Sequence, residues 1–311
     1  MRQEPRVRAN PLVYRRVAAA QSQDPVLPLN RCSFLESCQA EYALRGGIVE
    51  HGKPEDAYGK IQYRGLIAWP ERLRREKPLL ERVLGTAPIK SLLDLGCGTG
   101  EHSRFLRSLG FEVSGVDASE AQLRAAREAD PDEEGDVHPR YVQGDLGSIG
   151  SLVPAGYGGA ICLGNTLPHL REAGTLQRFL DELASRLVSG APLLLQLLNY
   201  DLILDGGERT FPLSLRPGEA PGEEIIFMRL MTPRPDGTLI FTPATLRYRP
   251  GLESPLELVS AQNVQLRGWR RSELEGALQA AGFEVFETFG SMTGDPWNPE
   301  TSDLVLWATK A

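Results

Sequence analysis

The fold is decided by residues 92–100, which read Leu-Leu-Asp-Leu-Gly-Cys-Gly-Thr-Gly. A short apolar strand runs into three glycines at alternate positions, and a helix opens near Glu101. Glycine lacks a Cβ, so this turn can bend sharply and let a ligand approach the backbone closely. The free N–H groups at the start of the following helix point back at the turn and suit an anionic group. The stretch therefore predicts a strand–turn–helix unit that binds a ligand.

A carboxylate at the end of the next strand narrows the choice of ligand. Asp117 lies 21 residues after Gly96, where an acidic side chain can accept hydrogen bonds from ribose hydroxyls. Nicotinamide- and flavin-binding folds usually carry G-x-G-x-x-G, whereas this turn is G-x-G-x-G with Asp94 before it. The shorter form resembles the first motif of class I S-adenosylmethionine-dependent methyltransferases. A nicotinamide-dependent oxidoreductase and a non-catalytic adenosyl-ligand-binding protein remain as alternatives.

Composition restricts the partners of this 311-residue chain. The net charge of −7 gives no basic footprint, so we expect no nucleic-acid partner. Apolar runs stay below the roughly 18 residues of a membrane span, so we expect no membrane partner. The four histidines and four cysteines lack metal-ligand spacing, so we expect no metal. The composition is typical of a cytoplasmic protein and leaves the oligomeric state unknown.

Alternating strands and helices predict an α/β fold: a doubly wound, mostly parallel, Rossmann-like sheet with an antiparallel β insertion after the fifth strand. The expected strands of the parallel part are 91–95, 112–116, 141–143, 159–163 and 192–198. We expect four regions: a poorly ordered N-terminal extension (1–52), the methyltransferase core with the cofactor site (53–205), an antiparallel insertion or lid (206–267), and the C-terminal part of the core (268–311).

Periodicity and capping residues predict the remaining elements. A helical stretch is expected over 60–84, and Ser119 opens the helix after Asp117 as the first residue of a capping box. A leucine-rich helix ends at Gly190, and a later helix is capped by Ser272 with Glu275. In the insertion, strands are expected at 224–231, 239–248 and 256–266, and residues 283–289 and 304–309 form a closing antiparallel pair.

Polar residues follow the third, fourth and fifth strands, at the edge where ligands bind in this fold. Asp145 can accept a hydrogen bond from an adenine amino group. Asn165 offers an amide that can donate and accept, and His169 can orient a substrate or relay a proton near neutral pH. Tyr200 can bind a polar substrate head, or its neighbours can simply form a turn. We therefore predict Asn165, His169 and Tyr200 as the catalytic residues.

Residues 161–169 and 199–201 resemble glycine N-methyltransferase and the related glycine/sarcosine N-methyltransferases. The resemblance implies that an arginine binds the methionine carboxylate, an aromatic side chain closes over the methionine part, and Asn165 holds the substrate. Tyr248 is a weaker match to a substrate-side tyrosine. We predict contacts to the cofactor, S-adenosyl-L-methionine, from these residues: Tyr63, Arg72, Gly96, Gly98, Asp117, Ala118, Asp145, Leu146 and Leu163.

One position departs from the resemblance. The family carries an arginine immediately before Asn-Tyr-Asp to bind the carboxylate of glycine, and this chain has Leu198 there. Leucine cannot make the bidentate contact that arginine makes with a carboxylate. We therefore expect methyl transfer to a small-molecule acceptor at an amine nitrogen, with glycine a poor substrate and neutral or apolar-tailed amines better ones. If glycine is methylated efficiently, Arg247 or Arg249 is the first candidate for the missing cation.

Overall fold

The computed structural model describes residues 67–130, 141–207 and 209–311. The expected N-terminal extension and Tyr63 lie outside these described residues. No helix among the described residues is long and apolar enough to cross a membrane. The helix that was expected over 60–84 begins at Trp69 and runs to Leu84 as α3.

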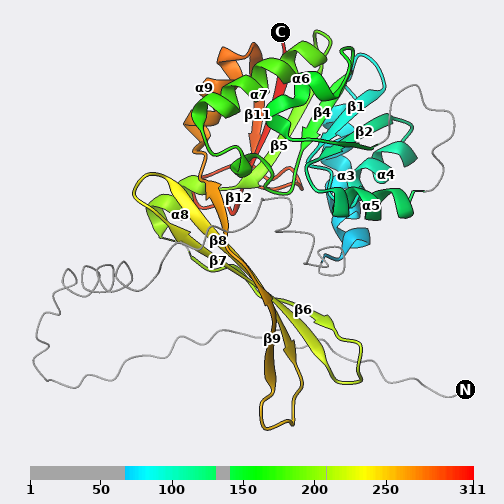
Figure 1. Ribbon diagram of the computed structural model, residues 1–311. Helices are drawn as coiled ribbons and strands as arrows, with labels where there is room; N and C mark the ends of the chain where they lie inside the picture. Colours follow the sequence, from blue (N-terminus) through cyan, green and yellow to red (C-terminus); the bar gives the residue numbers. More distant parts are fainter. Residues whose placement is uncertain (1–66, 131–140, 208) are drawn as a thin grey trace, which may run out of the picture. The chain divides into compact units, whose positions relative to one another are not determined.

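A seven-stranded sheet forms the centre of the structure (Figure 1), in the order β11-β12-β5-β4-β1-β2-β3. The first five strands in the chain are parallel, so their carboxyl ends meet at one edge. β12 is antiparallel to β5, so its first residue lies at that same edge. The strand bounds are β1 Ser91–Leu95, β2 Glu112–Asp117, β3 Tyr141–Gln143, β4 Gly159–Cys162, β5 Pro192–Leu198, β11 Phe283–Phe289 and β12 Asp303–Lys310.

Helices cover both faces of this sheet, as the near-continuous apolar strands require. One face packs against α3 and α4, and the other against α7 and α9, each with its own buried cluster (Figure 1). Short helices fill the connections. The helix bounds are α4 Glu101–Ser108, α5 Glu120–Glu128, η2 Leu146–Ser148, α6 Ile149–Leu152, η3 Leu167–His169, α7 Ala173–Arg186, α8 Tyr200–Gly206 and α9 Arg271–Ala280.

The insertion after β5 and α8 forms a second, antiparallel sheet, in which β10, β8, β7 and β6 follow one another and β9 also pairs with β8. Met231, Phe241 and Leu266 of this sheet join the buried cluster that contains Leu197 and Tyr200. One face of the second sheet is thus fixed against the core. The strand bounds are β6 Ser214–Pro217, β7 Glu224–Pro233, β8 Thr238–Tyr248, β9 Leu256–Ala261 and β10 Val264–Arg267.

The structure corrects three local expectations. The single strand expected over 256–266 is two strands, because the chain leaves β8 after Ala261 and rejoins it at Val264. The leucine-rich helix ends at Arg186 rather than Gly190, because Leu187 turns extended and pairs with Tyr157.

The third correction concerns a helix cap. The N-cap of α9 is Arg270, not Ser272, because the side chain of Glu273 accepts the backbone N–H of Arg270. The other expected cap is present: Ser119 Oγ accepts the backbone N–H of Gln122, at 3.3 Å, at the start of α5. The closing antiparallel pair, β11 and β12, is also found.

Candidate functional site

The glycine turn after β1 is shaped by close contacts on one side and open space on the other. Gly96 has a φ of 73°, and a Cβ there would lie 2.4 Å from the Thr166 side chain in the loop after β4. Gly98 has a φ of 55°, and a Cβ there would meet nothing within 4 Å. Positive φ angles favour glycine at both positions. The turn therefore packs tightly against the β4 loop and leaves its backbone open to a ligand at Gly98.

Asp117 is fixed by the backbone around it. Its Oδ2 accepts the N–H of Gly98 at 2.8 Å, and its Oδ1 accepts the N–H of Ser119 at 2.9 Å. Burial raises the pKa of this carboxyl, and the backbone hydrogen bonds oppose that rise. A carboxylate has about four lone-pair sites, so two remain after these bonds. The side chain is thus oriented in advance and can still accept ligand hydroxyls.

The tips of β2 and β3 carry the other residues predicted to contact the adenosine part. Asp145 Oδ1 accepts the N–H of Gly147 at 2.7 Å, while Oδ2 has no hydrogen-bond partner among residues 67–130, 141–207 and 209–311. The Leu146 side chain is buried in the core, so only its backbone can face a ligand. The carbonyl of Ala118 accepts the Gln143 side chain at 3.4 Å. Asp145 keeps one oxygen available.

Arg72 belongs to a group of side chains that joins α3 to α4. Its Nε donates to Glu76 at 2.7 Å, and the other oxygen of Glu76 lies 2.7 Å from His102 Nε2. Trp69 lies under the guanidinium, with Cζ 5.0 Å from the ring centre, and meets the His102 ring edge-on. Because α4 starts at the glycine turn, these contacts hold Arg72 in a defined place relative to that turn. Its two terminal nitrogens have no partner in the described part of the chain.

Asn165 follows β4 and has an unusual backbone, with a φ of 66°. Such left-handed angles cost energy for a residue other than glycine and are enriched at functional sites, although asparagine tolerates them best. Its Oδ1 accepts the backbone N–H of Leu198 and the hydroxyl of Tyr200, both at 3.1 Å. The side-chain nitrogen has no partner among the described residues. Asn165 can therefore donate a hydrogen bond to a ligand through its Nδ2. Its oxygen is already used, so the expected ability to accept as well is not available.

Tyr200, which the sequence predicts to contact the substrate, lies inside the protein. Its side chain is fully buried, and its hydroxyl is used by Asn165. Burial raises the pKa of the phenol far above its usual value. A Cβ on Gly268 would lie 3.0 Å from the Tyr200 ring, so the backbone packs directly on it. The Tyr200 hydroxyl therefore helps to hold the Asn165 side chain in place.

His169 lies at the end of η3, between Asp145 and Arg171. Burial lowers the pKa of its imidazole to about 4; the charge of Arg171 lowers it further and that of Asp145 opposes this. The ring is therefore neutral at pH 7. This fits the orienting role expected for His169 and disagrees with proton relay near neutral pH.

The sequence neighbours of Tyr200, Asn199 and Asp201, form hydrogen bonds that stabilise the fold. Asn199 caps α8, and its side-chain nitrogen donates to the carbonyls of Pro299 and Thr301. Asp201 accepts from the side chain of Arg270 and from the backbone of Arg271. These contacts tie the end of β5 to the chain before β12 and to α9, which agrees with the turn-forming alternative.

Tyr248 lies away from the strand tips. It is five residues beyond Pro243 on β8, about 17 Å along the strand. At that far end, Arg247 and Arg249 form ion pairs with Glu223 and Glu257. Among the described residues, no hydrogen bond or ion pair joins Tyr248, Arg247 or Arg249 to Asn165, and their expected roles at the acceptor stay predictions.

Sequence reasoning missed two charged residues near Leu198. Asp303 is the first residue of β12 and the direct partner of Leu198 across the sheet. Burial raises the pKa of Asp303 to about 6; Gln196 hydrogen-bonds to it, and the charges of Arg72 and Arg229 lower its pKa. The sequence signal for Arg229 was a charged residue at an inward-facing position of β7. The apolar residues around it hide the alternation of inward and outward side chains that would have shown this position.

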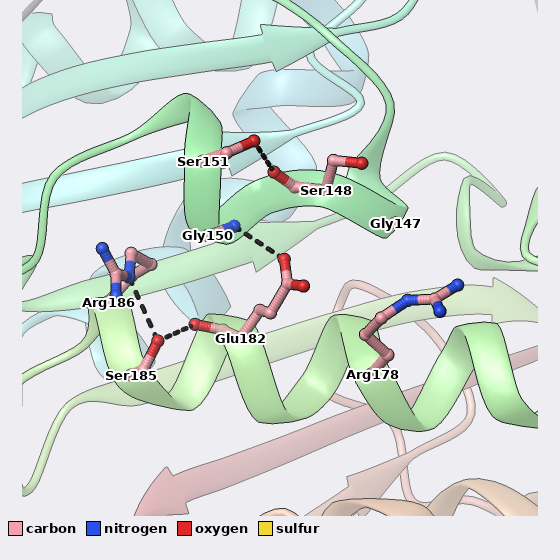
Figure 2. Close-up of a pocket in the computed structure, with 8 residues that line it drawn as sticks. All are labelled: Gly147, Ser148, Gly150, Ser151, Arg178, Glu182, Ser185 and Arg186. Carbon is pink, nitrogen blue, oxygen red and sulfur yellow. Dashed lines mark hydrogen bonds between the residues drawn. The ribbon is translucent and has the colours of Figure 1, made fainter.

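A surface hollow borders the loop after Asp145 and is lined by residues 147–151 and by α7 (Figure 2). Figure 2 shows Glu182 of α7 accepting the N–H of Gly150, and Ser151 bonded to the carbonyl of Ser148. These polar groups are already satisfied within the protein. None of the predicted site residues lines the hollow. The candidate site is therefore the row of strand tips: Leu163, which is buried, and the loop 164–166 lie at its middle.

Comparisons with known proteins match this chain to methyltransferases. The profile of a family described as a methyltransferase domain matches residues 92–190. A glycine/sarcosine N-methyltransferase of Aphanothece halophytica is 34% identical over 142 residues, covering 46% of this chain and 53% of that protein. Glycine N-methyltransferase of Rattus norvegicus is 34% identical over 130 residues, covering 37% and 43%. The chain thus spans about half the length of these curated relatives.

Solved structures match over most of the chain. An S-adenosylmethionine-dependent methyltransferase from Clostridium acetobutylicum superposes with a TM-score of 0.62 at 12% identity, covering 88% of this chain and 99% of that one. A calicheamicin-pathway amino pentose methyltransferase from Micromonospora echinaspora has a TM-score of 0.61 at 21% identity, covering 84% and 98%. At these identities the likeness shows the fold. The matched domain favours a methyltransferase over the nicotinamide-dependent alternative. Residues 92–190 thus match a methyltransferase domain, and the chain shares its fold with S-adenosylmethionine-dependent methyltransferases.

Proposed function

We propose that this protein is an enzyme that transfers the methyl group of S-adenosyl-L-methionine to the nitrogen of a small-molecule amine. The observation that carries the proposal is the strand-tip row, in which the open glycine turn and Asp117 lie beside the loop that holds the fixed, donating amide of Asn165. The glycine and glycine/sarcosine N-methyltransferases among its relatives support nitrogen as the methylated atom.

The residues at the first three strand tips fit the cofactor. The open backbone at Gly98 leaves room for a bulky ligand, and Asp117 would hold the ribose. The free oxygen of Asp145 would accept from the adenine amino group. Arg72 would bind the methionine carboxylate through its terminal nitrogens, because Glu76 occupies only its Nε.

Bound S-adenosylmethionine supplies a methyl group on a positively charged sulfur. The protein's task is then alignment, because an in-line displacement depends mainly on the distance and direction of the attacking nitrogen. Asn165 can orient the acceptor only through its Nδ2, since its oxygen holds Leu198 and Tyr200. The neutral ring of His169 would help to orient the acceptor and would leave its charge unchanged at pH 7.

Two measurements test the proposal. Calorimetry should detect binding of S-adenosylmethionine, and a panel of small amines should release S-adenosylhomocysteine when mixed with enzyme and cofactor. Binding without release for any amine would favour the non-catalytic adenosyl-ligand-binding alternative. Absence of cofactor binding would remove the proposal altogether.

A further inference from the structure

The loss of the arginine at position 198 raises the question of what else could bind an acceptor's charge. Leu198 lies at the carboxyl end of β5, directly opposite Asp303 on β12. The charge of Arg229 on β7 acts on Asp303. The second sheet therefore brings a cation to the region of the acceptor site that Leu198 leaves uncharged.

Arg229 occupies an inward-facing position. Side chains alternate between the two faces of a strand, so Arg229 shares a face with Phe227 and Met231, which are both buried. Its direct partner on β8, Pro243, is buried as well. The guanidinium lies over the Phe211 ring, with Cζ 5.0 Å from the ring centre. In the described part of the chain it forms no ion pair or hydrogen bond.

Asp303 is a carboxylate without an ion-pair partner among the described residues. Its side chain is hydrogen-bonded to Gln196, whose Oε1 accepts the N–H of Gly164 at 2.7 Å. Gly164 immediately precedes Asn165, so a short chain of hydrogen bonds joins Asp303 to the acceptor-side amide. The charged groups around it are Arg72 and Glu76 on α3 and Arg229 on β7.

Resting on the function proposed above, we propose that Arg229 and Asp303 are the acceptor-binding charges of this enzyme. Arg229 binds an anionic oxygen group of the acceptor, and Asp303 binds its ammonium, which loses a proton to solvent before the neutral nitrogen attacks the methyl group. Asn165 Nδ2 is a further donor for an acceptor oxygen, since its own oxygen is already used. A cation and a carboxylate that are unpaired among the described residues, together with a donor amide, complement an amine that carries an anion, which departs from the neutral or apolar-tailed acceptor expected from Leu198.

Matched pairs of acceptors test this assignment. Glycine is compared with glycinamide, and 2-aminoethyl phosphate with ethanolamine, by S-adenosylhomocysteine release; the two pairs separate carboxylate from phosphate. The wild-type enzyme should prefer the anionic member of at least one pair. Arg229→Met should raise its KM about 10- to 100-fold, as expected for losing a charged hydrogen bond. Arg234→Met, on the exposed turn after β7, is the matched control and should leave KM unchanged.

The outcomes separate the two proposals. If the neutral member is methylated equally well and Arg229→Met has no effect, this inference is wrong while the proposed function stands. If no amine is methylated although the cofactor binds, the proposed function fails, and this inference fails with it.

The role of Asp303 is tested separately, through kcat/KM, cofactor affinity and pH dependence. Asp303→Asn should lower kcat/KM for every accepted amine about 10- to 100-fold and leave cofactor affinity unchanged, with exposed Asp181→Asn as the matched control. The wild-type kcat/KM should fall below pH 6, where the carboxyl takes up a proton, and the variant should lack that step. An equal loss of cofactor affinity would assign Asp303 to the cofactor's ammonium and overturn its acceptor role. In Arg229→Met, the pKa of Asp303, followed by NMR, should rise; an unchanged pKa would show that the two charges do not face each other.

Discussion

The cofactor half of the strand-tip row, at β1 to β3, differs in construction from the acceptor half, at β4, β5 and β12. In the cofactor half, the backbone forms most of the site: two backbone N–H groups orient Asp117, and Gly98 leaves its backbone open to a ligand. In the acceptor half, Asn165 depends on the Tyr200 side chain, and Asp303 depends on Gln196. Backbone construction suits a ligand that all members of a fold share, whereas side-chain construction lets specificity change by substitution.

The largest effect is expected from a substitution in the cofactor half. Asp117→Ala removes the carboxylate that would bind the ribose, so cofactor affinity should fall about a hundredfold, or about 3 kcal/mol. Calorimetry on the folded variant measures it. Glu120→Ala, an acidic residue paired with Arg127 on the surface of α5, is the matched control. Equal affinity for wild type and Asp117→Ala would remove the ribose assignment.

The second prediction separates the two halves by changing the acceptor half alone. Asn165→Ala should lower kcat/KM for the acceptor more than tenfold, and Tyr200→Phe about fivefold, because the latter loses only one hydrogen bond. Both variants should bind the cofactor normally. If Tyr200→Phe changed cofactor affinity and left turnover alone, Tyr200 would not act through Asn165.

The third prediction follows from the register of β5 and β12. In Leu198→Arg, the new guanidinium lies opposite Asp303 and can pair with it, as opposite charges do across strands. The single variant should therefore shift preference towards carboxylate-bearing amines only weakly, by a few-fold. Leu198→Arg with Asp303→Asn frees the guanidinium and should shift it by about 1–3 kcal/mol. Ratios of kcat/KM for glycine and glycinamide measure both; equal shifts would mean that the two positions do not interact.

The fourth prediction concerns stability. The folded-state pKa of Asp303 is raised to about 6, from 3.8, so between these values the folded protein keeps a proton that the unfolded chain has released. Wild-type stability therefore falls as pH rises through this window, by about 1–3 kcal/mol. Asp303→Asn lacks that loss, so its Tm should exceed that of wild type by a few degrees at pH 7 and match it near pH 4. A Tm difference that is constant with pH would contradict the buried, unpaired carboxylate.

The smallest effect is expected from removing residues 1–45. The main compact unit of the chain spans Gly52–Ala311, so the truncated protein should keep its Tm within about 2 °C. Thermal unfolding of the two proteins, side by side, measures this. A large drop in Tm would show that the extension stabilises the core.

The sequence by itself determined the central sheet and much of the cofactor half. The turn at 96–100 and the carboxylate of Asp117 depend on local requirements, since positive φ angles select glycine and a parallel strand ends at a fixed edge. The strands of the parallel sheet were expected within about one residue of their ends, because continuous apolar runs between turn signals define them. Asn165 was predicted for the same reason, as a polar residue at a strand tip.

Only the tertiary structure decided which residues come together in the acceptor half and how burial changes them. Asp303 meets Leu198 because two antiparallel strands pair in one register, and nothing near Asp303 in the sequence specifies that partner. Whether Tyr200 contacts a ligand or Asn165 depends on burial by a distant backbone, at Gly268. His169 became a neutral ring because burial lowers its pKa. Contacts between residues far apart in the chain, and the desolvation they cause, arise from packing and not from local sequence.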